Sequence, residues 1–292
     1  MGWIEYTIAT IYGFASVLLY FIADYVIVRH RKIFDSSFFQ LFLYESALNL
    51  LLYSVNYFSM RVSLIASRGS VLAVFYEELD WDIFLSFVYG MRYHMAYVQY
   101  TIIMLIALNR LTVVKYDLEK YWRSYCWIAI LGTFLIPLIN THIVFKYTCR
   151  FAYKEAEDDY SLTTTMPVKD IYEYLLPYMV LASVLAFILN TMSYFTVQSM
   201  TTLSKKRVNA NFIKLIGITC LIEIIGTAIS VCLYLKFALP QWSLSFLNEI
   251  LPYVSESLTL LQPWLLMRDN MRHTLGFPKK SVAVFKSRSL TS

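Results

Sequence analysis

The feature that most constrains this chain is a series of long, continuously apolar stretches separated by polar connectors. Seven of them contain the roughly 20 residues that a helix needs to cross the ~30 Å hydrocarbon core of a bilayer. Their approximate bounds are 6–28, 37–59, 90–113, 125–145, 172–198, 212–237 and 246–267. Residues 102–108, Ile-Ile-Met-Leu-Ile-Ala-Leu, lack the polar face that a helix of a soluble bundle would need. We therefore predict an all-α membrane protein, a bundle of seven transmembrane helices.

Composition agrees with this interpretation, because 58% of the residues are hydrophobic and only 15% are charged. A soluble domain is typically about half apolar and a quarter charged. Transmembrane strands are excluded, since they alternate apolar and polar residues and these stretches do not. We predict a seven-transmembrane domain at residues 1–267 and a basic tail at 268–292. The start, Met-Gly-Trp-Ile-Glu, lacks the basic region of a signal peptide, so we expect the first stretch to stay in the membrane.

Lys and Arg in the connectors predict the orientation, because basic residues are retained on the cytoplasmic side. If the N-terminus is extracellular, most of the 25 basic residues fall inside. This inner set comprises Arg29, Arg31, Lys32, Arg110, Lys115, Lys120, Arg123, Lys205, Lys206, Arg207, Lys214 and the basic residues of the tail. Acidic residues gather in the outer connectors, at 77–82 and 155–159. We therefore predict an extracellular N-terminus and a cytoplasmic tail.

Three motifs at the ends of the predicted spans are more specific than the spans themselves. The third span ends in Asn109-Arg110-Leu-Thr112-Val-Val114, and Tyr121-Trp122 follows in the next connector. The second span is introduced by Phe34-Asp35-Ser36-Ser37-Phe38 and contains Asn49 and Asn56. The seventh contains Gln262-Pro263-Trp264. With these segments the chain resembles the class gamma serpentine receptors of nematodes, and the resemblance extends over most of its length.

The resemblance implies a G-protein-coupled-receptor-like fold and a chemosensory receptor that recognises a small molecule and activates a heterotrimeric G protein. It implies a multi-pass protein of the lipid bilayer, in the plasma membrane of a sensory cell, without a nucleic-acid partner. The residues that it assigns to G-protein coupling are Asn109, Arg110, Lys205, Lys206 and Arg207. Rhodopsin-like receptors carry an acid where this chain has Asn109, so a neighbouring acidic lock on Arg110 is missing. The resemblance implies that Arg110 contacts the G protein or holds the inactive state. We expect its guanidinium to reach the membrane–water interface, and the alternative role is that of an ordinary basic anchor.

Polar side chains inside the spans indicate where a ligand would bind, because each costs roughly 2.5–3.5 kcal/mol unless it has a partner or a cavity. We predict a ligand cavity between the outer halves of the third, fifth, sixth and seventh spans. Its candidate residues are Arg92, His94, Tyr97, Glu249, Tyr253 and Glu256. In the alternative interpretation, Arg92 and Glu249 form a structural ion pair, while Glu223 and Glu256 are protonated and hydrogen-bonded between helices.

Other polar residues have simpler expected roles. Asn49 and Asn56 lie seven residues apart on one helix face, where interhelical hydrogen bonds are expected. Cys149 and Cys232 both fall on the outer side, so either a disulfide or two free thiols is compatible with the sequence. Phosphate-binding loops, zinc patterns and nucleophile motifs are missing from the sequence, so we expect no enzyme and no cofactor.

Two other functions are weighed against a receptor. A transporter would use intramembrane acids to line a pathway, but the paired repeats typical of transporters are not found in the sequence. A ligand-gated channel of the inverted seven-helix kind would place the N-terminus in the cytoplasm. Tags at each end, stained with and without permeabilisation, distinguish that channel from a receptor.

Overall fold

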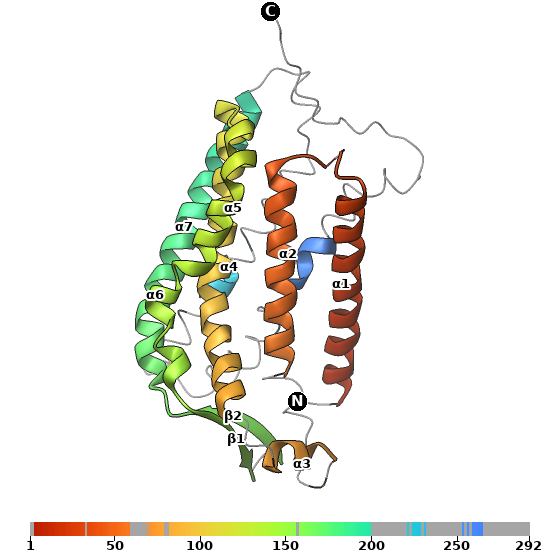
Figure 1. Cartoon of the computed structure of the whole chain (residues 1–292), viewed down its shortest axis with the longest axis vertical. Helices are drawn as coiled ribbons and strands as arrows, with labels where there is room; N and C mark the ends of the chain where they lie inside the picture. The colour runs from red at the N-terminus through yellow and green to blue at the C-terminus, as the bar shows by residue number, and fades with distance from the viewer. Residues whose placement is uncertain are drawn as a thin grey trace, which may run out of the picture.

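A computed structural model of the chain describes residues 3–32, 34–58, 69, 71–78, 82–155, 158–199, 221, 224–228, 231, 253, 256 and 259–264. Its helices are α1 (Trp3–Arg29), α2 (Ser37–Asn56), α3 (Val71–Glu78), α4 (Asp82–Tyr116), α5 (Glu119–Leu135), α6 (Leu138–Thr141) and α7 (Val168–Ser199). A 3₁₀ turn, η3 (Val144–Lys146), and two strands, β1 (Cys149–Lys154) and β2 (Asp159–Thr164), lie between α6 and α7. The long helices run side by side along the long axis of the molecule (Figure 1).

Five helical segments of the described chain are long and apolar enough to cross a membrane. They are Tyr6–Arg29, Ser37–Asn56, Ile83–Tyr116, Glu119–Thr141 and Asp170–Ser199, and they overlap the first five predicted spans. The third segment begins at Ile83, before the predicted bound of residue 90, because residues 82–90 form the N-terminal part of α4. The predicted sixth and seventh spans lie mostly outside the described residues, among which 224–228 and 259–264 are helical.

The centre of the described bundle is α4. It packs against α2, α5 and α7. In its most apolar 18-residue stretch 56% of the residues are buried, whereas the corresponding share in the other four segments is 22% to 39%. The other long helices keep large apolar side chains exposed, such as Phe14 and Phe21 on α1 and Phe187 and Phe195 on α7. An exposed apolar surface of this kind is compatible with lipid tails as its surroundings. The core of the bundle lies around α4, and the apolar outer faces of the other long helices point away from it.

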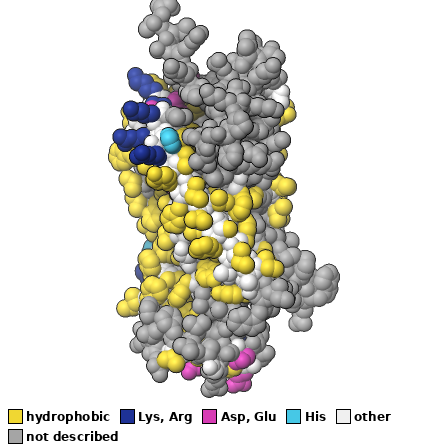
Figure 2. All heavy atoms as spheres, turned by 90° about the vertical axis from the view of Figure 1, so that its right-hand side faces the viewer, with side chains coloured by type: hydrophobic (Ala, Val, Ile, Leu, Met, Phe, Trp, Pro, Cys, Tyr) yellow, Lys and Arg dark blue, Asp and Glu magenta, His cyan; other side chains and the backbone are white. Residues whose placement is uncertain are grey.

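Charged residues separate toward the two ends of the bundle. Arg29, Arg31 and Lys32 are exposed where α1 ends, while Glu77 and Asp158 are exposed on α3 and beside β2. On the face shown in Figure 2, Lys and Arg gather near one end beside an acidic side chain, further Asp and Glu lie at the other end, and hydrophobic side chains cover much of the middle. The hairpin and α3 lie at the end where α1 begins (Figure 1).

The connector between the fourth and fifth spans departs from the all-α prediction. In it, β1 and β2 pair as an antiparallel hairpin with Cys149 opposite Thr164. Aromatic side chains hold this hairpin on α3, because the ring of Tyr76 lies 4.5 Å from that of Phe151 and 5.3 Å from that of Tyr160. Aromatic residues favour strands when their rings can pack against neighbours. The fold is therefore mostly helical, with a small sheet at one end.

Candidate functional site

The N-terminus of α2 is capped by Glu119, which lies at the start of α5. The first turn of a helix has backbone N–H groups without an intrahelical acceptor, and the side chain of the N-cap residue Ser36 makes no capping bond. Ser37 donates to both oxygens of the Glu119 carboxylate instead, from its backbone N at 2.7 Å and from its Oγ at 2.8 Å. A carboxylate in this position is also favoured by the helix dipole. The connector after α4 is thereby attached to α2.

Asn109 joins α4 to the same pair. Its Nδ2 donates to Ser37 Oγ at 2.8 Å, and that hydroxyl in turn donates a hydrogen bond to Glu119 Oε2. Both Asn109 and Ser37 are buried, at 1% and 0% exposure, and a buried donor that loses its acceptor carries the full cost of desolvation. Asn109 is therefore connected to the Glu119 carboxylate through one hydroxyl, which attaches α4 to the start of α5.

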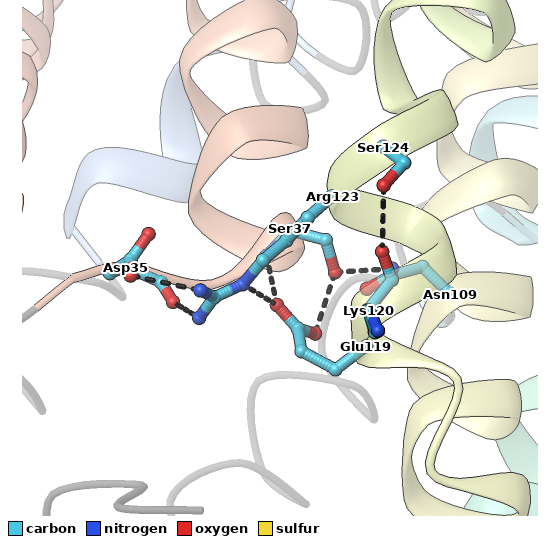
Figure 3. Close-up of polar contacts among 7 residues, drawn as sticks. All are labelled: Asp35, Ser37, Asn109, Glu119, Lys120, Arg123 and Ser124. Carbon is cyan, nitrogen blue, oxygen red and sulfur yellow. Dashed lines mark hydrogen bonds and ion pairs between the residues drawn. The ribbon is translucent and has the colours of Figure 1, made fainter.

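Arg123 and Asp35 extend this arrangement to the protein surface. Arg123 Nε donates to Glu119 Oε1 at 3.0 Å, and its Nη1 forms an ion pair with Asp35 Oδ2 at 2.9 Å. Figure 3 shows these side chains converging where α2 begins and α4 gives way to α5. We call this set the inner-end network: Asp35, Ser37, Asn109, Glu119 and Arg123. Because a network shares its contacts among members, breaking one bond weakens the others.

Thr112 and Trp122 fasten the connector from a second side. Trp122 Nε1 donates to Thr112 Oγ1 at 2.8 Å, and Thr112 Oγ1 donates to the Leu108 carbonyl at 2.7 Å. The conformation of the turn between them requires a left-handed backbone at Asp117, with φ of 53°, which Asp tolerates better than most residues. The end of α4 and the start of α5 are thus held together as one unit.

Arg110 does not extend to the interface, and the expectation that it would is wrong. Its side chain is buried at 8% exposure, and its guanidinium carbon lies 5.1 Å from the ring centroid of Phe38. A guanidinium over an aromatic face is stabilised by the negative charge of the ring face. Arg110 is therefore part of the bundle core, packed against α2.

A buried acid of α2 connects this arginine to the helical stretch 259–264. Glu45 is buried, and its carboxyl oxygen accepts a hydrogen bond from the side-chain amide of Gln262. Arg110 lies within electrostatic range of Glu45. Polar contacts inside a membrane protein link helices because lipid offers no alternative partner. Glu45 thus ties α2 to stretch 259–264 and places an acid near Arg110.

Tyr20 satisfies a carbonyl that a proline has released. Pro263 has no N–H, so it cannot donate to the carbonyl of Thr259, four residues earlier in the helix. The hydroxyl of Tyr20 donates to that carbonyl and accepts a bond from Asn49 Nδ2 at 3.0 Å. Gln99 Nε2 lies 3.4 Å from Asn49 Oδ1. The predicted interhelical role of Asn49 is therefore confirmed, and the bonds link α1, α2, α4 and stretch 259–264.

Tyrosines line the contact between the N-terminal halves of α4 and α7. The ring of Tyr97 lies 4.9 Å from that of Tyr178, and the Tyr178 hydroxyl bonds to Thr101. One helical turn nearer the start of α4, the hydroxyls of Tyr89 and Tyr93 are 3.0 Å apart. Polar tips on largely apolar rings give this seam both hydrogen-bonding capacity and hydrophobic surface.

Arg92 and His94 occupy different surroundings. Arg92 is half-buried and interacts electrostatically with Tyr89, Tyr93 and Tyr172. His94 is fully buried on the side of the fourth span, where its Nδ1 lies 2.8 Å from Thr141 Oγ1. The structure therefore groups Arg92 and Tyr97 with the tyrosines between α4 and α7, and it places His94 away from that group.

The other predicted site residues are described only in part. Tyr253 is 41% exposed, and Glu256 is half-buried and within electrostatic range of Tyr12 on α1. Glu249, Lys205, Lys206 and Arg207 lie outside the described residues. Cys149 is buried at the start of β1, whereas Cys232 also lies outside. The ion pair and the disulfide considered above therefore stay predictions.

Comparison of the chain with known proteins identifies its family. A family model described as Srg family chemoreceptor matches residues 6–274. The chain belongs to the Srg chemoreceptor family. It is 22% identical over 204 residues to serpentine receptor class gamma-31 of Caenorhabditis elegans, a match that covers 68% of this chain and 65% of that relative. The predicted resemblance to class gamma serpentine receptors is confirmed.

In this Srg-family protein, several residues of the site were not singled out from the sequence. Glu119 was overlooked, although a helix beginning at Asp35-Ser36-Ser37 needs an acceptor for its first N–H groups and Ser36 does not provide one. Tyr20 was overlooked as well, although counting four residues back from Pro263 identifies a released carbonyl. Each signal indicates that a partner is needed, but neither indicates which residue supplies it.

Proposed function

We propose that this Srg-family protein is a G-protein-coupled chemosensory receptor, which binds a small molecule in its outer half and activates a heterotrimeric G protein at its inner end. The inner-end network supports this function, because it joins α2, α4 and α5 beside the buried Arg110. Basic residues on the same side of the bundle support a cytoplasmic location for that end, with the N-terminus outside.

The coupling surface in this proposal comprises Asn109, Arg110, Lys205, Lys206 and Arg207. Basic connectors suit an acidic partner surface, since complementary charge speeds encounter and fixes orientation. Arg110 is buried over Phe38 in the present arrangement. Activation would therefore require α2 and α4 to move apart at their inner ends, so that a G protein can reach the guanidinium.

The ligand site in this proposal comprises Arg92, Tyr97, Glu249, Tyr253 and Glu256. The tyrosine seam between α4 and α7 supports it, because aromatic rings with hydroxyl tips suit a small organic molecule. The contacts of His94 with the fourth span favour a structural role for that residue. A ligand shifts the receptor toward its active arrangement only if it binds that arrangement more tightly.

Replacing Arg110 by Ala is expected to lower ligand-stimulated G-protein activation by at least about tenfold, since a buried charged group contributes roughly 1.5–3 kcal/mol through its hydrogen bonds. The measurement is a small-molecule screen on cells that express the chain with an N-terminal tag, read by a G-protein dissociation sensor. Surface staining of intact cells monitors expression and orientation. Arg31→Ala is the matched control, because Arg31 is an exposed basic residue of an inner connector.

A transporter or channel gives a different outcome in the same cells. Ligand-stimulated uptake or current that persists when G proteins are inhibited would favour those alternatives, as would a tag at the N-terminus that stains only after permeabilisation. Unchanged signalling by Arg110→Ala at normal surface expression would contradict the role proposed for that arginine.

A further inference from the structure

Among the described residues, Arg92 in the outer half of the bundle forms no ion pair with a carboxylate. Arg92 lies ten residues after the start of α4, or about 15 Å along the helix. It is half-buried, and the ion pairs found among the described residues join Arg123 to Asp35 and Glu119 and do not include Arg92. On α7, Asp170 and Glu173 are the acids closest in sequence to Tyr172, and both are exposed. Removing a charge from water is costly unless an opposite charge accompanies it.

The groups around Arg92 are phenols. Its charge interacts with Tyr89 and Tyr93 on α4 and with Tyr172 on α7, and the ring centroids of Tyr93 and Tyr172 lie 6.1 Å apart. A phenol is neutral at physiological pH, since its ordinary pKa is about 10. These tyrosines can therefore solvate a guanidinium, but they cannot neutralise it.

The hydrogen-bonding capacity of this group is dominated by donors. Tyr89 and Tyr93 share one hydrogen bond between their hydroxyls, so one proton of the pair is used and the second is available to another acceptor. The guanidinium adds five N–H donors in a planar fork that matches the two oxygens of a carboxylate. The positive charge and planar fork of Arg92, together with a spare hydroxyl proton, make an arrangement that is complementary to an oxyanion.

The apolar side chains beside these donors determine which kind of anion would bind. The tyrosines belong to a buried cluster that also contains Leu85, Ile171 and Leu175. Hydrophobic surface beside a donor group favours an organic anion over an inorganic one, because its apolar body is removed from water on binding. We propose that Arg92, Tyr89, Tyr93 and Tyr172 recognise the oxyanion of an amphipathic small molecule, most simply a carboxylate. This assignment rests on the proposed receptor function and names the chemical class of its ligand.

The test measures binding directly, without a G protein. The full-length protein is purified into nanodiscs of phosphatidylcholine, and its midpoint of thermal unfolding is followed with octanoate, benzoate or decyl phosphate. The matched neutral probes are 1-octanol, benzyl alcohol and 1-decanol. A ligand that binds only the folded state raises the midpoint. At least one anion is expected to raise it well above the effect of its neutral partner.

Variants assign that difference to the proposed residues. Arg92→Gln is expected to lower the affinity for the anion at least about tenfold, since hydrogen bonds to a charged group contribute roughly 1.5–3 kcal/mol. Arg92→Lys keeps the charge without the fork, so it should retain intermediate affinity. Tyr93→Phe should weaken binding by a smaller factor. Arg150→Gln, at an exposed arginine of β1, is the control and should bind like the natural protein.

A second arm identifies the source of the anion. Nanodiscs that contain phosphatidylglycerol, without added probe, should stabilise the natural protein over Arg92→Gln only if a lipid headgroup occupies the site. Either source supports oxyanion recognition. Equal shifts with all anionic and neutral probes, or full anion binding by both Arg92→Gln and Arg92→Lys, would overturn it. Anion binding that persists in the absence of any G-protein response would refute the proposed signalling and leave this inference standing.

Discussion

Replacing Tyr20 by Phe is expected to lower the free energy of unfolding by about 1–3 kcal/mol, although only one oxygen atom is removed. The hydroxyl donates to the Thr259 carbonyl and accepts from Asn49, so its loss removes one hydrogen bond from each of two buried polar groups. Buried polar groups in this state cost roughly 1–3 kcal/mol each, and interhelical bonds in membranes contribute toward the lower end. Unfolding in mixed micelles, followed by tryptophan fluorescence, measures the change.

The proline offers a specific rescue. In a Tyr20→Phe, Pro263→Ala double variant, residue 263 regains an N–H that can donate to the Thr259 carbonyl within the helix. We expect the double variant to be more stable than the sum of the two single changes predicts, by about 1 kcal/mol in a double-mutant cycle. Tyr25→Phe is the matched control, because Tyr25 is 67% exposed on the same helix.

Additive effects in that cycle would show that the released carbonyl is not what Tyr20 stabilises. A Tyr20→Phe variant as stable as the Tyr25→Phe control would show that the hydroxyl contributes nothing measurable. Both outcomes are distinguishable from general misfolding, because the control replaces the same residue type on the same helix.

Replacing Glu119 by Gln is expected to raise basal G-protein activation several-fold and to destabilise the protein by about 1–3 kcal/mol. The carboxylate accepts two bonds from Ser37 and one from Arg123, whereas an amide has a single acceptor oxygen and introduces donors that face other donors. If the inner-end network stabilises the resting arrangement, weakening it by 1.4 kcal/mol shifts the population about tenfold toward the active one.

Basal activity is measured with the G-protein dissociation sensor and normalised to the amount of receptor at the cell surface. Glu155→Gln serves as the control, because Glu155 is an exposed acid at the opposite end of the bundle. A Glu119→Gln variant that unfolds more easily but shows unchanged basal signalling would assign the network to stability alone. Asn109→Ala should also raise basal G-protein activation, since the Asn109 amide is connected to the same carboxylate through Ser37.

The predicted transmembrane segments illustrate what local sequence can reveal. The five helices of the described chain that can cross a membrane overlap segments that were recognised from apolar runs alone. Family membership was likewise predictable, because Asn109-Arg110 and its neighbours are contiguous in the sequence. The β-hairpin was not predicted, since its strands are short and their aromatic residues need α3 to pack against.

Arg110 shows where local sequence misleads. A basic residue at the end of a transmembrane helix ordinarily extends to the interface, and its sequence neighbours agree with that expectation. The guanidinium is buried instead, because Phe38 and Glu45 of α2 provide a ring face and a nearby acid. Neither residue is close to Arg110 in the sequence.

Hydropathy and contiguous motifs are local properties, so the amino-acid sequence is enough to identify the segments that can cross a bilayer and the family of the chain. The partners of the polar side chains are known only from the way the helices pack. Ser37 and Glu119 are 82 residues apart, and Tyr20 and Thr259 are 239 apart. The physical reason is that lipid leaves each polar group to find its partner on another helix, and only packing determines which helix that is.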